Sequence, residues 1–300
     1  MRSPIWGNFF ALLLLFMLLF GQVFLTPLIS LIPLSEFQRQ LALNLLLYGL
    51  PLALFFLLVP ENPKTGLMLR WPGKVNLVLA FACGITVQPL MMIVSALSSL
   101  AFPNQVTEAI ASYADTPVWE MLLFVAVLPA FFEELYFRGL ILGSYRGVSF
   151  FRAALASALL FAITHLDGQQ FFYAFLMGLL FAYFTCRTHS VLPSMVTHFT
   201  VNATQSLLAH ALLASPLAAE AETDAAVTIS SIALSFLQTL PMTICFIICL
   251  FLFARHNAPK GEPEGEEALD FAPIDGGRRL IDGFYFLCIG IFIFILFLEY

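Results

Sequence analysis

The sequence predicts an all-α protein, a polytopic transmembrane helical bundle of about eight to nine spans, with a polar site among spans four, five and seven. Of its 300 residues 60% are hydrophobic and 11% are charged, whereas soluble domains carry roughly 25% charged residues. Several apolar runs are longer than the roughly 18–20 residues that cross a bilayer. The basic residues between these runs fall onto alternate sides, as membrane topology requires.

Apolar stretches separated by charged residues or by proline and glycine give the candidate spans. They cover approximately residues 8–32, 41–60, 75–101, 118–145, 153–166, 169–186, 191–213, 227–254 and 281–298. The stretches suggest three parts: N-terminal spans with an interfacial helix near 103–117 (1–116), a motif-bearing core (117–213), and C-terminal spans with an acidic loop at 256–280 (214–300). No inverted repeat of the kind found in transporters divides the chain.

The loop charges predict the orientation. Nearly all Lys and Arg outside the spans alternate onto the side of the N-terminus, so we expect a cytoplasmic N-terminus. The first apolar run follows one arginine and has no small-residue cleavage site, which indicates an uncleaved anchor. Compact basic loops favour a bacterial inner membrane, with an organelle membrane as the alternative. Basic stripes with interleaved aromatic residues are absent, so nucleic acid is not an expected partner.

The fourth span carries three charged residues in the stretch "LPAFFEELYFRGLIL" (128–142). An ionised side chain at mid-bilayer costs at least about 2.5–3.5 kcal/mol, so each needs a partner. Glu134 and Arg138 are spaced i,i+4 with the acid first, the favourable order for a helical ion pair. Glu133 projects about 100° away around the helix. It is therefore the acid without a predicted partner.

Two further spans place polar residues at a similar depth. His165 ends the stretch "FAITH" in the fifth span, and His198 and Asn202 share one face of the seventh in "HFTVN". Counted at about 1.5 Å per residue from the basic end of each span, Glu133 and both histidines lie roughly 16–20 Å deep, and Asn202 roughly 22 Å. Three helices would thus bring an acid, two imidazoles and an amide to one level of the membrane.

This set of groups is suited to hydrolysis of an amide. Glu133 would act as general base toward a water oriented by His165. His198 and Asn202 would donate hydrogen bonds to the oxyanion of the tetrahedral intermediate. Arg138 would hold Glu134, which would brace the helix around Glu133.

Other chemistries remain open at this point. A divalent metal such as zinc could instead be held by Glu133, His165 and His198 and activate the water, although the HExxH motif is absent. The SxxxH spacing of Ser194 and His198 leaves serine chemistry as a minor alternative.

The three motifs, Glu133 to Arg138 (EExxxR), Phe161 to His165 (FxxxH) and His198 to Asn202 (HxxxN), resemble in type and order those of the CPBP family. That family includes the CAAX prenyl proteases and bacterial abortive-infection and bacteriocin-processing relatives. The resemblance covers roughly residues 117–210. It implies an intramembrane protease in which Glu133 and His165 share the activated water, Glu134 and Arg138 support them, and His198 and Asn202 face the oxyanion. It leaves a glutamate-type and a metal-dependent mechanism open.

Two other classes of function compete with this one. A proton- or ion-coupled transporter could use the same acid and histidines as a relay, and a membrane scaffold or immunity factor could keep the motifs for folding alone. The expected substrate of a protease is a membrane-embedded or lipidated protein or peptide in the surrounding bilayer.

Overall fold

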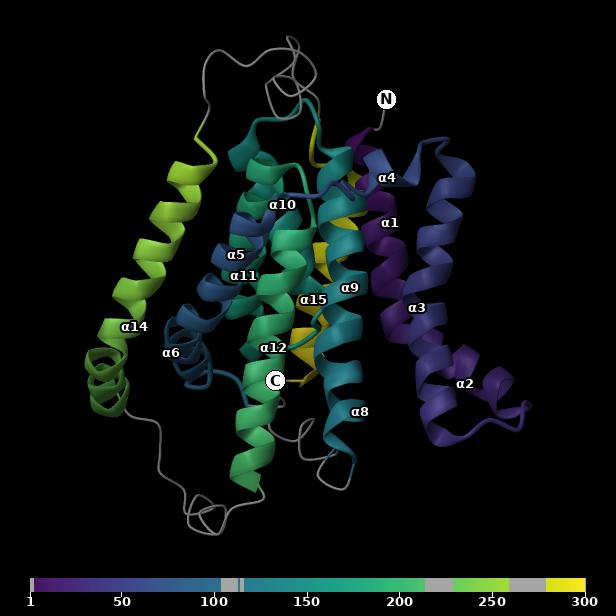
Figure 1. Cartoon of the computed structure of the whole chain (residues 1–300). Coiled ribbons are helices and arrows are strands. Elements are labelled where there is room, and N and C mark those ends of the chain that lie inside the picture. The colour runs from purple at the N-terminus through teal and green to yellow at the C-terminus, as the bar shows by residue number, and fades with distance from the viewer. Residues whose placement is uncertain (1–2, 104–112, 114–115, 214–228, 259–278, 300) are drawn as a thin grey trace.

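A computed structural model describes residues 3–103, 113, 116–213, 229–258 and 279–299. Every secondary-structure element within these ranges is a helix, and the helices run side by side in a bundle (Figure 1). The predicted fold class, an all-α polytopic bundle, is confirmed. Much of the predicted interfacial helix at 103–117 and of the acidic loop at 256–280 lies outside the described residues.

The helices are numbered in chain order, and η marks a π-helical segment. They are α1 (Pro4–Phe16), η1 (Met17–Gly21), α2 (Gln22–Ser30), α3 (Glu36–Leu58), α4 (Pro63–Gly66), α5 (Lys74–Thr86), α6 (Gln88–Ser98), α8 (Val118–Leu122), η2 (Leu123–Val127), α9 (Leu128–Glu134), η3 (Leu135–Leu142), α10 (Phe150–Ile163), α11 (Gly168–Thr188), α12 (Leu192–Leu213), α14 (Ile229–His256) and α15 (Gly283–Glu299).

Several helices are long and apolar enough to cross a membrane. Among the described residues there are four by length and composition, which lie at Pro4–Ser30, Glu36–Leu58, Gly168–Thr188 and Leu237–His256. The pair α5 and α6, bent by 41°, makes a fifth if it is one span. Helices α10 and α15 are apolar but short. The stretch from α8 to η3 and helix α12 carry the charged and polar motif residues, which lowers their hydropathy, so the count of about eight to nine spans stays a prediction.

Local sequence signals begin and end the helices as expected. Ser35 caps α3 in a capping box with Gln38, in which each side chain accepts from the other's backbone N–H. Asp167 caps α11 by accepting from Gln169 N at 2.8 Å. Proline in the first turn of α6 removes a backbone donor there. The chain therefore bends between α5 and α6.

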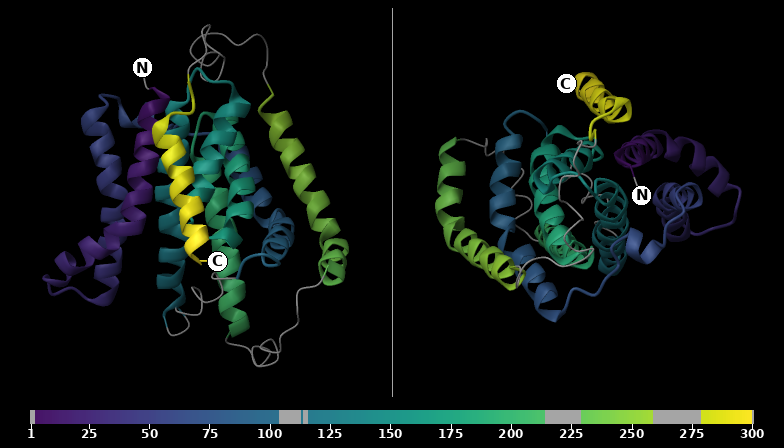
Figure 2. Two further views of the ribbon diagram at one scale, coloured as in Figure 1. Left: turned by 180° about the vertical axis from the view of Figure 1, so that it is seen from behind. Right: turned by 90° about the horizontal axis from the view of Figure 1, so that it is seen from above.

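The bundle has a central group of helices and two looser edges. Helices α9, α10, α11 and α12 occupy the centre, with α5 against α12 and α15 against α1 and α10 (Figures 1 and 2). Helices α2 and α3 form one edge, and α14 forms the other beside α5 and α6. Only 6% of the most apolar window of α14 is buried, so this helix presents most of its surface to lipid.

The crossing of α10 and α11 is close because of a glycine. A Cβ on Gly178 would lie 2.9 Å from the Cα of Ala158, nearer than real contacts of this kind allow. Small residues let membrane helices approach backbone to backbone. The carbonyl group of Gly178 is thereby brought close to Arg138 of the neighbouring η3.

The turns that carry the basic residues meet at one end of the bundle, the upper end in Figure 1. Arg146 lies 3.9 Å from Glu61 and donates to the carbonyl of Thr65. At the same end Ser190 donates to the carbonyl of Arg70. These contacts agree with the prediction that the basic loops lie on the same side. That this side is cytoplasmic stays a prediction.

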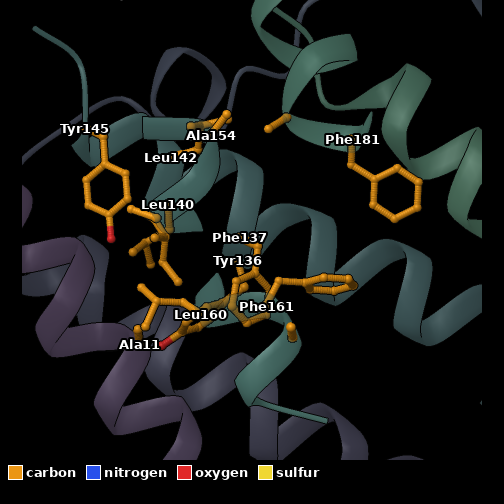
Figure 3. Close-up of a cluster of buried hydrophobic side chains, with 14 of the residues drawn as sticks. Ala11, Tyr136, Phe137, Leu140, Leu142, Tyr145, Ala154, Leu160, Phe161 and Phe181 are labelled. Atoms are coloured by element: carbon orange, nitrogen blue, oxygen red, sulfur yellow. The ribbon is translucent and has the colours of Figure 1, made fainter. Parts of the chain in front are cut away.

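The apolar core lies directly against this arrangement of charges. Figure 3 shows Phe137 of η3, Phe161 of α10 and Phe181 of α11 among the buried side chains of the central helices. Phe137 and Phe161 meet edge to face, with ring centroids 5.2 Å apart. The faces of these rings also contact the polar motif residues, so core and site share a boundary.

Candidate functional site

The two acids lie on a helix whose winding changes on either side of them. Residues 118–142 run without a break through α8, η2, α9 and η3, so π-helical turns flank the short α9 that ends at Glu134. π-Helical segments are rare and frequently mark functional sites. They alter which side chains share a face of the helix. Glu133 and Glu134 both lie in α9, between the two π-helical segments.

Glu134 lies at the centre of a closed ionic cluster. Its Oε1 atom is 3.2 Å from Arg138 Nη1 and 2.9 Å from His198 Nδ1. The side chains of Glu134 and Arg138 are both 0% exposed. The predicted i,i+4 pair is therefore present, and His198 joins it from α12. A buried charge without such partners would be strongly destabilising.

Aromatic rings and a carbonyl enclose the positive charge of Arg138. Its guanidinium carbon is 4.3 Å from the ring centroid of Phe161 and 4.9 Å from that of Phe181. Its Nη2 donates to the carbonyl of Gly178 at 3.3 Å. Cation–π contacts of this kind gain strength where water is excluded. The arginine is thus fixed by two neighbouring helices, α10 and α11.

The same elements orient His198. Its ring stacks on Phe181 with centroids 5.1 Å apart and an interplanar angle of 22°. Because Nδ1 faces the Glu134 carboxylate, the hydrogen bond assigns a proton to Nδ1. The other ring nitrogen, Nε2, is then the one available to the cavity that His198 lines. Functional histidines are commonly held in one orientation by a carboxylate in this way.

Glu133 lies apart from this cluster. Its Oε1 accepts a hydrogen bond from the hydroxyl of Tyr48 at 3.2 Å. The side chain is half-buried and lines a cavity, unlike that of Glu134. The prediction that the adjacent acids face different surroundings therefore agrees with the structure.

His165 differs from its predicted placement. The fifth span was expected to run over 153–166, but α10 ends at Ile163 and His165 lies in the turn that follows. The helix stops because Leu166 has a positive φ of 57° and Asp167 caps the next helix. His165 Nδ1 is 2.9 Å from the carbonyl of Phe161. That contact assigns the proton to Nδ1 and leaves Nε2 as the acceptor.

Asn202 makes a backbone contact in addition to lining the cavity. Its Nδ2 donates to the carbonyl of Val125 at 3.0 Å. Val125 belongs to the π-helical segment η2. A carboxamide nitrogen has two N–H groups, so one remains for another acceptor. The contact fixes the amide against the motif helix.

Two cavities meet at Glu133 and His165. The larger, of about 370 Å³, is lined by Glu133, His165, His198 and Asn202 together with mostly apolar side chains, among them Met91 and Met177. The smaller, of about 250 Å³, is lined by Leu14, Leu18, Tyr48, Glu133, Phe137, Thr164, His165 and Leu166. Glu134 and Arg138 line neither and lie behind the cavity wall. Four of the six predicted site residues thus border one space.

The donor groups do not converge as a metal site would require. Within the described ranges, no three His, Cys, Asp or Glu side chains are arranged to hold a metal ion. The alternative ligand set was Glu133, His165 and His198, and Nδ1 of each histidine faces a protein acceptor, which leaves each Nε2 free. Because these groups are not gathered around one point, no step is derived through a metal. Ser194 donates to the carbonyl of Val191 at 2.8 Å, which gives no support to serine chemistry.

Sequence reasoning missed some of the residues that build the site. Tyr48 lies in an apolar run with no motif around it, and only its polar hydroxyl in that run could have drawn attention. Phe181 and the carbonyl of Gly178 carry no sequence signal for contact with an arginine on another helix.

Comparison with known protein families gives one match. Residues 115–204 match the family model described as Rce1-like, type II CAAX prenyl endopeptidase Rce1-like. All six predicted site residues, from Glu133 to Asn202, lie inside the matched segment. No curated protein and no solved structure shows a significant match to the chain. The resemblance to the CAAX protease family is confirmed.

Proposed function

Because residues 115–204 match the family model of the Rce1-like CAAX endopeptidases, we propose that this integral membrane protein is an intramembrane endopeptidase. It cleaves peptide bonds of membrane-associated proteins or peptides with a water activated by Glu133 and His165. The observation that carries the proposal is the cavity of about 370 Å³ bordered by Glu133, His165, His198 and Asn202.

In the proposed reaction, Glu133 is the general base. Its carboxylate takes a proton from a water that His165 Nε2 orients, and the water oxygen attacks the carbonyl carbon of the scissile bond. Glu133 then gives the proton to the amine as the C–N bond breaks, which leaves a carboxylate and an amine product. Proton transfer by a positioned side chain contributes roughly 10²–10⁴-fold to such reactions.

His198 and Asn202 are the proposed oxyanion partners. The N–H of Asn202 that does not bond to Val125 can donate to the developing charge. His198 can do so through Nε2 when both ring nitrogens carry protons, with Nδ1 donating to the Glu134 carboxylate. Donors preorganised toward an oxyanion are worth roughly 10²–10³-fold each. Glu134 and Arg138 act through His198 and are positioning residues.

The substrate class follows from the family and from the walls of the cavity. The name of the matched family refers to prenylated CAAX proteins, so a farnesylated peptide ending in a CAAX sequence is the first probe. Apolar residues such as Met91 and Met177 form part of the cavity wall. We further propose a bacterial inner membrane and a cytoplasmic N-terminus, since the basic turns gather at the same end of the bundle as α1 begins.

The test uses the full chain in proteoliposomes. An internally quenched farnesylated CAAX peptide is supplied to the wild type, to Glu133→Gln and to a matched control, Glu120→Gln, which makes the same change in α8 away from the cavity lining. Cleavage by the wild type and the control but not by Glu133→Gln supports the proposal. In parallel, membrane peptides of cells expressing the wild type and Glu133→Gln are compared by mass spectrometry.

The same preparations test the competing functions. Proton or ion flux that depends on Glu133, with no peptide cleaved in either assay, would replace the protease with a transporter. Full biological activity in Glu133→Gln would indicate a scaffold or immunity factor.

A further inference from the structure

A tyrosine outside the matched segment contacts the proposed general base. Tyr48 belongs to α3 (Glu36–Leu58), whereas the family match begins at residue 115. Its hydroxyl donates to Glu133 Oε1 at 3.2 Å. Tyr48 and Glu133 both line the smaller cavity of about 250 Å³, as does His165. The N-terminal helices therefore reach the site although they carry no family motif.

The hydroxyl of Tyr48 is held in place by the packing of its ring. The ring stacks on that of Phe132, which precedes Glu133, with centroids 5.6 Å apart and an interplanar angle of 15°. The stack limits rotation about χ1, which would carry the hydroxyl away from Glu133. The contact joins α3 to α9, and the two helices pack against each other.

The hydrogen bond has a direct consequence for a carboxylate in an apolar wall. A donor to the ionised form stabilises that form, and hydrogen bonds to charged groups are stronger than neutral ones. Tyr48 occupies one oxygen of Glu133 and leaves the other for water. It therefore sets the rotational position of the acid that must take the proton.

We propose that Tyr48 is a positioning residue for Glu133, through a hydrogen bond that holds the carboxylate turned toward the space it shares with His165. This inference rests on the proposed function. It assigns part of the catalytic arrangement to the N-terminal helices, so residues 115–204 alone do not make up the whole site.

A pH readout must be separated from the other titratable groups around Glu133. These groups are Glu134 and Arg138 of the same helix, His165 after α10, Tyr173 of α11, His198 of α12, and Tyr113, which lines the larger cavity. All of them are unchanged in Tyr48→Phe. A difference between this variant and the wild type therefore reports the lost hydroxyl.

The experiment compares Tyr48→Phe with Tyr285→Phe in full-length protein. Tyr285 also makes a 3.2 Å hydrogen bond, to the carbonyl of Ala156, far from the acids in sequence and outside both cavities. Two readouts are followed against pH. One is kcat/KM for the farnesylated peptide; the other is the infrared carboxyl band that disappears in Glu133→Gln, which needs no substrate.

Tyr48→Phe is expected to lower kcat/KM about 10- to 100-fold at neutral pH, mostly in kcat. It should also shift the frequency of the infrared carboxyl band, because the band responds to the hydrogen bonds that the acid accepts. Tyr285→Phe should leave both unchanged. If Tyr48→Phe fails to fold, Phe132→Leu, which keeps the hydroxyl but loosens its ring, should give a smaller shift in the same direction.

An unchanged kcat/KM and infrared band in Tyr48→Phe, or equal changes in Tyr285→Phe, would overturn the role of Tyr48. The hydrolase proposal stands or falls separately, because it depends on loss of cleavage in Glu133→Gln.

Discussion

The surroundings of Glu133 and Glu134 differ although the two acids are adjacent in sequence. Glu134 is 0% exposed and bound to Arg138 and His198, whereas Glu133 borders two cavities and accepts a hydrogen bond from Tyr48. A carboxylate enclosed by opposite charges is committed to holding its partners. A carboxylate at a cavity wall can meet a water and a substrate. Under the proposed function, Glu134 is therefore a structural residue and the adjacent Glu133 a catalytic one.

Glu133→Gln should cause the largest change, and only in activity. The amide keeps the shape but cannot take a proton, so we expect kcat/KM to fall about 10²–10⁴-fold with an unchanged unfolding midpoint. Initial rates with the quenched peptide and thermal unfolding in detergent measure the two quantities. A large loss of stability would show that Glu133 is also a structural residue.

Glu134→Gln should reverse this pattern. It leaves Arg138 buried without a counter-charge, so the free energy of unfolding should fall by about 3–5 kcal/mol. Denaturant titration in detergent micelles measures it. Activity should fall as well because the acceptor of His198 loses its negative charge. A variant as stable as the wild type would contradict the closed ionic cluster.

Phe181→Leu should give an intermediate effect. It keeps an apolar side chain but removes the ring over Arg138 and the stack on His198, which should cost about 1–2 kcal/mol beyond the packing loss. Phe184→Leu is the matched control, because Phe184 is also fully buried but packs on Phe253 away from the charges. Equal losses of unfolding free energy in the two variants would argue against the cation–π contact.

Glu36→Gln should have the smallest effect. Its side chain is 89% exposed and its ion pair with Arg39 spans 3.6 Å, so we expect less than about 0.5 kcal/mol change in unfolding free energy. The same substitution in two glutamates therefore separates a buried ion pair from an exposed one. A change as large as that in Glu134→Gln would mean that the measurement does not report local burial.

The sequence predicted those features that one helix or one run of residues can encode. The apolar runs gave the helices, and the i,i+4 spacing gave the contact of Glu134 with Arg138. The order of the motifs predicted the resemblance that the match over residues 115–204 confirms. Similar depths along three spans predicted that Glu133, His165, His198 and Asn202 lie together. All four line one cavity, although their catalytic roles stay proposals.

Features that depend on contacts between helices were not predictable from spacing. The bond from His198 to Glu134 joins α12 to α9, and no spacing along the sequence predicts a contact between these two helices. Tyr48 gave no signal because one tyrosine in an apolar span has no periodicity. The turn at His165 arises from a positive φ at Leu166. Leucine rarely adopts this conformation, so the residue type does not predict the turn.

The position of Arg138 and Glu134 on one continuous helix has a consequence for biosynthesis. Chains enter the bilayer from the N-terminus, so the helix of residues 118–142 arrives before α12 and its His198 have been made. Because the opposite charges are four residues apart on that helix, they can neutralise each other during insertion without help from any later segment. Moving the arginine to α12 would keep the final charge balance, but Glu134 would then enter the bilayer without its counter-charge.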